Sequence, residues 1–149
     1  MYKTIDNIHI LCYTLTMENN YRHTTTTVSL INYHFVFCPR YRRKIFLISK
    51  VEERFKTLVN NICEELNINI LAIECDKDHV HMFLNCLPTQ NPSDIMQQIK
   101  GCTSKILREE FIELQKMPSL WTRSYFVSTA GNVCSETIKK YVENQKTRY

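Results

Sequence analysis

Two apolar runs flank a short polar turn in INILAIECDKDHVHMFLNCL, residues 68–87. The runs, Ile68 to Cys75 and His79 to Leu87, are rich in β-branched and aromatic residues, which favour strands. The residues between them, Asp76-Lys77-Asp78, are typical of a tight connection between strands. The stretch therefore predicts an antiparallel β-hairpin.

The second strand of this hairpin separates two kinds of side chain, because alternate residues point to opposite faces of a strand. One face is wholly apolar and is expected to lie under helices; it consists of Val80, Met82, Leu84 and Cys86. The opposite face carries His79, His81 and Asn85. Two imidazoles on one strand face can reach a single metal ion, although most such pairs in proteins are incidental.

The segments before the hairpin predict one strand and one helix. Residues Val28 to Cys38 are dense in β-branched and aromatic side chains and form a strand that Pro39 ends. Ser49 is the expected N-cap of a helix that runs to about Leu66 with an apolar stripe at helical spacing.

The segments after the hairpin predict two helices and a strand. Asn91-Pro92 is a favourable helix start, and this helix is expected to run to about Leu114. Residues Tyr125 to Thr129 are expected to be extended, and a last helix begins near Ser135. The order strand, helix, strand, strand, helix, strand indicates an α+β fold of the ferredoxin-like, split-βαβ type, with helices on one face of an antiparallel sheet.

The length of 149 residues fits a single domain. We expect a poorly organised leader over residues 1–27, one domain over residues 28–149, no membrane span and a cytoplasmic location. The chain has seven cysteines, and the nearest two are eleven positions apart, so it contains no Cys-x-x-Cys metal or redox unit.

The charge pattern permits a nucleic-acid partner. The net charge is +4, and two internal clusters of basic residues are candidate DNA-binding groups: Arg40, Arg42 and Arg43, then Lys100, Lys105 and Arg108. Aromatic residues accompany the first cluster, as expected where phosphates are neutralised and bases stack. A solvated basic face over an aromatic core explains the charges equally well.

The last predicted helix carries a tyrosine and an amide on one face. Tyr141 and Gln145 are four residues apart and are therefore neighbours on the helix surface. The Tyr141 hydroxyl and the Gln145 amide oxygen could both approach a metal ion held by His79 and His81. Taken alone, Tyr141 is more typical of a core aromatic and Gln145 of a surface amide.

Together these motifs resemble a known family. The segment DHVHMF, residues 78–83, resembles the histidine-hydrophobic-histidine motif of the HUH nucleases. The segment KYVENQ, residues 140–145, is similar to the nucleophile helix of their single-tyrosine transposases, the IS200-like group of insertion sequences. Three further stretches also resemble this group, and the likeness extends from about Ser29 to Gln145: YHFVFCPRYR (33–42), IKGCTS (99–104) and LWTRSYF (120–126).

The resemblance implies a specific chemistry. His79, His81 and Gln145 would ligate a divalent metal, Mg²⁺ or Mn²⁺, and Tyr141 would attack a phosphodiester and remain bound to the 5′-phosphate. The partners implied are single-stranded DNA hairpins at the ends of the element. A second copy of the chain is also implied, in a homodimer whose tyrosine helix can complete the metal site of the other subunit.

Two other classes of protein remain open at this point. A non-catalytic module that binds single-stranded nucleic acid on a ferredoxin-like sheet would show the same basic and aromatic residues, but would need neither the two histidines nor Tyr141. A relaxase or replication initiator of the same superfamily would usually carry more chain. Covalent trapping on single-stranded DNA distinguishes these classes.

Overall fold

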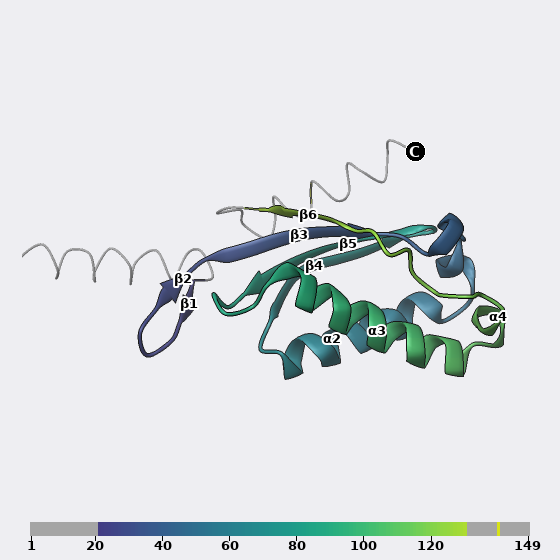
Figure 1. Ribbon diagram of the computed structural model, residues 1–149, viewed down its shortest axis with the longest axis horizontal. Coiled ribbons are helices and arrows are strands. Elements are labelled where there is room, and N and C mark those ends of the chain that lie inside the picture. Colours follow the sequence, from purple (N-terminus) through teal and green to yellow (C-terminus); the bar gives the residue numbers. More distant parts are fainter. Residues whose placement is uncertain (1–20, 131–139, 141–149) are drawn as a thin grey trace, which may run out of the picture.

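The computed structural model describes residues 21–130 and residue 140. Its main sheet has four strands: β3 (Ile31–Phe37), β4 (Asn69–Asp76), β5 (His79–Cys86) and β6 (Phe126–Thr129). Two helices, α2 (Val51–Glu65) and α3 (Pro92–Glu110), pack together against one face of this sheet (Figure 1). Within residues 21–130, no helix covers the opposite face.

The strand order in the sheet is β4-β5-β3-β6, and every neighbouring pair is antiparallel. With the chain order β3-α2-β4-β5-α3-β6, this is the predicted ferredoxin-like arrangement, which is confirmed. The register of the two central strands places His34 opposite Phe83 and Val36 opposite His81. His34 and His81 are therefore diagonal neighbours on one sheet face.

The core lies between the sheet and the two helices. The predicted apolar face of β5 is confirmed, since Val80, Met82, Leu84 and Cys86 are each 0% exposed. Phe55 and Val59 of α2 and Ile99 and Leu107 of α3 are also fully buried. Because the helices bury this face, the polar residues of β5 must point to the open side.

The helix ends agree only in part with the expectations. The Asn91 cap is confirmed, because its side-chain oxygen accepts a hydrogen bond from the Asp94 backbone N–H at 2.9 Å. The Ser49 cap is wrong: a 3₁₀ turn, η2 (Ile45–Leu47), leads into α2 through Lys50. Lys50 is the N-cap, has φ 68° and makes no side-chain capping bond.

The helix predicted to run to Leu114 is broken at Phe111. This residue is extended, with φ −116° and ψ 112°, and a short helix α4 (Ile112–Gln115) follows. The break turns the chain so that Leu114 and Met117 enter the core, where they are 1% and 2% exposed. Arg108 secures the turn by donating a hydrogen bond to the Met117 carbonyl at 2.8 Å.

A small hairpin precedes the sheet. Its strands β1 (Arg22–His23) and β2 (Val28–Ser29) pair in antiparallel fashion, and Leu30 separates β2 from β3 within the strand predicted over residues 28–38. Arg22 donates to the backbone and side-chain oxygens of Asn67 at 2.8 Å each. The described end of the predicted leader is thus ordered and attached to the domain.

The last predicted helix, from about Ser135, lies outside the described residues except for Lys140, which is helical. No helix in the part of the chain that the structure describes is long and apolar enough to cross a bilayer.

Candidate functional site

A pocket of about 670 Å³ lies where the β4–β5 turn meets β3 and β6, and its lining includes both predicted metal ligands. His79 and His81 come from β5, and Asp76 and Asp78 from the turn end of the hairpin. Arg42 comes from the 3₁₀ turn η1 (Arg40–Arg42), which follows β3. Titratable groups of both signs therefore surround the two imidazoles.

The Asp78 carboxylate orients His79. Its Oδ1 lies 2.9 Å from His79 Nδ1, and its Oδ2 lies 3.4 Å from Arg42 Nε. The hydrogen bond from His79 and the charge of Arg42 lower the pKa of Asp78, so this carboxyl stays ionised. A donating Nδ1–H leaves the His79 Nε2 lone pair available to a metal ion, and the Asp76 Oδ2 lies 3.9 Å from that nitrogen.

His34 orients His81 in the same way. His34 Nε2 lies 3.1 Å from His81 Nδ1, and the His34 ring stacks on Phe83 with centroids 4.2 Å apart and planes at 3°. Burial lowers the pKa of His34 to about 4, helped by the nearby His81. Burial also lowers the pKa of His81, as does the neighbouring His79.

The imidazoles of His79 and His81 lie side by side on β5, as two ligands of one divalent cation would. When His81 donates from Nδ1 to His34, its Nε2 lone pair is free, as for His79; the tautomers here follow from the hydrogen-bond partners. The ring centroids of His79 and His81 are 5.1 Å apart. No cluster of three or more His, Cys, Asp and Glu side chains suited to a metal occurs among the described residues. The other residues predicted to take part, Gln145 and Tyr141, lie outside the described residues.

The sequence did not reveal the contact between His34 and His81, although His34 lies within one of the segments that carry the family resemblance. In β3 it lies on the face opposite Phe35 and Phe37. Its contact with His81 depends on the pairing of β3 with β5, and the residues alone do not specify that register.

The predicted DNA-binding residues lie in different surroundings. Arg42 lines the histidine pocket and Arg40 lines a second pocket. Arg43 and Lys105 are exposed and line neither of the two. Lys100 donates to the carbonyls of Arg123 and Ser124 at 3.3 Å each. Arg108 contacts Met117, as described above. Lys100 and Arg108 therefore make structural contacts within the domain.

A pH-dependent loss of stability follows from His34. In the folded chain the pKa of His34 is lowered from 6.5 to about 4. Between pH 6.5 and pH 4 the unfolded chain therefore binds a proton at this residue that the folded chain does not bind. This contribution to stability is present above pH 6.5 and is lost as the pH falls toward 4. We expect the free energy of unfolding to fall when the pH is lowered from 7 to 5 in the presence of a metal chelator. The fall should be about 1–2 kcal/mol larger in the native chain than in the His34→Gln protein. Urea unfolding measures this, and equal losses in both proteins would contradict it.

Comparison with known proteins identifies the family of the chain. The profile of the family described as "Transposase IS200 like" matches residues 27–145. The transposase for insertion sequence element IS200 of Salmonella typhimurium is 35% identical over 116 residues, which are 76% of this chain and 75% of that protein. The ISDra2 transposase TnpA of Deinococcus radiodurans is 26% identical over 118 residues, 77% of this chain and 84% of that protein.

Solved structures share the fold. A crystal structure of a transposase from Deinococcus radiodurans superposes with a TM-score of 0.68 at 26% identity, and the match covers 83% of this chain and 97% of that one. A REP-associated tyrosine transposase bound to a REP hairpin superposes with a TM-score of 0.52 at 13% identity, over 83% of this chain and 67% of that one. From the match over residues 27–145 and the 35% identity, this chain belongs to the IS200-like transposases.

Proposed function

We propose that this transposase cleaves and rejoins single-stranded DNA at insertion-sequence ends through a 5′-phosphotyrosine at Tyr141, with a divalent metal and without ATP. The observation that carries the proposal is the pair of oriented imidazoles on the open sheet face. Asp78 and His34 each contact the Nδ1 of one histidine, so a ligand would bind to the Nε2 atoms. A purely nucleic-acid-binding module has no need for this arrangement.

Bond making and bond breaking balance in this scheme. The Tyr141 oxygen forms a bond to phosphorus as the bond from phosphorus to the 3′-oxygen breaks, and the leaving strand takes up a proton as a free 3′-OH. Attack by a 3′-OH on the phosphotyrosine restores a phosphodiester and the phenol. No phosphoester is lost to water, so rejoining needs no nucleotide hydrolysis.

The metal and the protein have separate tasks. A bound Mg²⁺ or Mn²⁺ would polarise the scissile phosphate, which an unassisted phenol with a pKa of ~10 attacks poorly at neutral pH. His79 and His81, joined by Gln145, would hold that ion, and an oxygen-rich shell completed by phosphate and water suits these metals. Arg42, which lines the same pocket, would contact the DNA backbone.

The partners proposed are hairpins and a second copy of the chain. The REP-associated tyrosine transposase of similar fold is bound to a REP hairpin, and we extend hairpin binding to this protein at the ends of its own element. We also propose a homodimer in which the helix carrying Tyr141 and Gln145 completes the metal site of the partner subunit.

Covalent trapping tests the proposal. The protein is incubated with a pool of randomised single-stranded oligonucleotides and Mg²⁺, and adducts that survive denaturation are separated and sequenced. An adduct at Tyr141 that requires metal and single-stranded DNA supports the proposal. A protein that binds the pool but never forms an adduct is a binding module instead.

The metal should bind more tightly when DNA is present. The protein ligands proposed are all neutral, so DNA phosphate must contribute much of the negative charge that the ion requires. Titration with Mn²⁺, with and without a single-stranded oligonucleotide, should therefore show a lower dissociation constant in the presence of DNA. The same affinity in both titrations would indicate an anionic protein ligand. Asp76 is then the candidate, because its carboxylate lies on the Nε2 side of His79 whereas Asp78 is on the Nδ1 side.

A further inference from the structure

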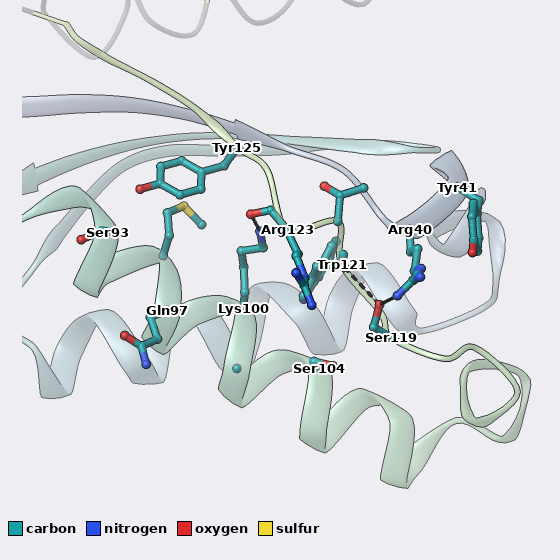
Figure 2. Close-up of a pocket in the computed structure, with 13 residues that line it drawn as sticks. Arg40, Tyr41, Ser93, Gln97, Lys100, Ser104, Ser119, Trp121, Arg123 and Tyr125 are labelled. Atoms are coloured by element: carbon teal, nitrogen blue, oxygen red, sulfur yellow. Dashed lines mark hydrogen bonds between the residues drawn. The ribbon is translucent and has the colours of Figure 1, made fainter.

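A second pocket, of about 790 Å³, lies between α3 and the segment that leads from α4 to β6 (Figure 2). Arg40, Tyr41, Lys100, Trp121, Arg123 and Tyr125 are among the residues that line it. It has one residue in common with the histidine pocket, Tyr125. The two pockets are therefore neighbours, divided by the segment around residues 123–125.

The second pocket is cationic. No acidic side chain lines it among the described residues, whereas Asp76 and Asp78 line the histidine pocket. Figure 2 shows Arg40 and Arg123 extending into the same pocket from different segments. Arg40 donates one hydrogen bond, to Ser119 Oγ at 2.9 Å, which leaves other guanidinium N–H groups for a ligand. Arg123 is exposed.

Lys100 builds the wall of the pocket instead of offering a free charge. Its Nζ is 3.3 Å from both the Arg123 and the Ser124 carbonyl oxygens and lies 5.6 Å from the centre of the Tyr125 ring. These contacts fix the segment that divides the two pockets. Arg40 and Arg123 are consequently the two cations of the pocket that are available to an anion.

A strained turn places Arg40 and Arg42, two residues of the first basic cluster, in different pockets. Tyr41 and Arg42 have φ values of 59° and 50°, in the left-handed region that non-glycine residues rarely occupy. Across this turn Arg40 and Tyr41 line the second pocket, while Arg42 lines the histidine pocket and contacts Asp78. The Arg40 guanidinium lies over the Tyr41 ring, 5.2 Å from its centre, and Tyr41 is still 69% exposed, which leaves ring surface for a base to stack on. Backbone strain of this kind is concentrated at functional sites.

We propose that the second pocket binds the single-stranded DNA segment that adjoins the cleaved bond, with a phosphate between Arg40 and Arg123 and a base stacked on Tyr41. Basic groups combined with exposed aromatic rings are the usual means of holding single strands. Because the pockets share Tyr125, successive nucleotides of one strand can occupy both. The position of this segment relative to the cleaved bond rests on the proposed function, but binding in the pocket can be measured without cleavage.

Trp121 provides a local signal for the test. It is the only tryptophan of the chain and lines the second pocket. An oligothymidylate of about 12 nucleotides, within the range that single-strand-binding sites accommodate, is titrated into the full chain in chelator, so that no cleavage occurs. The change in Trp121 fluorescence should saturate in parallel with the anisotropy of a labelled copy of the same oligonucleotide.

Two substitutions distinguish the phosphate contact from the base contact, and a third is the control. Arg123→Gln should weaken binding about tenfold and reduce the slope of log affinity against log salt by ~0.7, the loss of one phosphate contact on a single strand. Tyr41→Asn, which removes the ring and suits a left-handed backbone, should weaken binding about tenfold with an unchanged slope. Lys116→Gln, at an exposed basic residue that lines neither pocket, is the matched control and should change neither value.

Several results would overturn the proposal. Anisotropy that shows binding without a change at Trp121, native affinity in both Arg123→Gln and Tyr41→Asn, or an equal response to a blunt duplex of the same length would each exclude it. A His81→Ala protein distinguishes the two hypotheses, since it should lose adduct formation and retain the Trp121 response. If the native protein forms no adduct but gives the Trp121 response, the proposed function fails while single-strand binding in this pocket is upheld.

Discussion

A Tyr141→Phe protein is expected to form no denaturant-resistant adduct with single-stranded DNA, while its DNA binding stays close to that of the native chain. The change removes one oxygen, the atom proposed to bond to phosphorus, and keeps the ring. The loss should therefore be complete in the covalent step and small in affinity. Trapping on single-stranded oligonucleotides with Mg²⁺ measures the first, and gel shift of the same oligonucleotides measures the second.

Other tyrosines provide the control for this experiment. The chain contains eight tyrosines, and Tyr141 is the one followed four residues later by glutamine. Tyr33 lies in β3 and packs against the core, away from the pockets described above, so Tyr33→Phe should form adducts at the native level. A Tyr141→Phe protein that still becomes covalently attached to DNA would show that another residue is the nucleophile.

Local sequence patterns were sufficient to predict the faces and order of the sheet. Alternation along β5 identified the side chains that lie under the helices, Val80, Met82, Leu84 and Cys86, and placed His79 and His81 together on the other face. These features depend only on the period of a strand, so they can be inferred without knowledge of tertiary contacts. The cap at Asn91 was predictable for the same reason, because an Asx residue before proline is a local signal.

Features that depend on tertiary contacts were not predictable from the sequence. The contact between His34 and His81 requires the register of β3 against β5, which brings together residues that are 47 positions apart. The break at Phe111 interrupts a segment of good helical periodicity because Leu114 and Met117 gain burial when the chain turns. The sharp turn at Lys50 similarly follows from the preceding 3₁₀ turn and carries no local capping signal.

The roles of the basic residues also depend on the folded chain. Sequence placed Arg40, Lys100 and Arg108 together as candidate DNA-binding groups. In the structure Lys100 and Arg108 donate to backbone carbonyls, whereas Arg40 extends into a pocket beside Arg123, which the sequence had not marked. A charge pattern gives the number of cations, but the fold determines which of them remain free to bind phosphate.

A mixture of two inactive chains is expected to recover adduct formation if the sites are composite. His81→Ala lacks a metal ligand and Tyr141→Phe lacks the nucleophile, so each is inactive as a homodimer. In the trans arrangement, a heterodimer joins the intact histidines of the Tyr141→Phe subunit to the intact tyrosine of the His81→Ala subunit. One complete site per heterodimer results, and the adduct should form on the His81→Ala subunit. If the two chains carry tags of different length, a denaturing gel shows which subunit carries the covalently bound DNA.

The cis arrangement predicts the opposite result, because each site of the heterodimer then keeps one defect. The comparison requires proof that heterodimers form, for which co-purification through two different tags is sufficient. Yield provides a further check: random mixing of equal amounts gives about half heterodimers, each with one of its two sites intact, so recovery should reach about a quarter of the native adduct. Heterodimers without any adduct would exclude the trans model. They would leave intact the roles proposed for His79, His81 and Tyr141, since these depend on the site being complete and not on which subunit completes it.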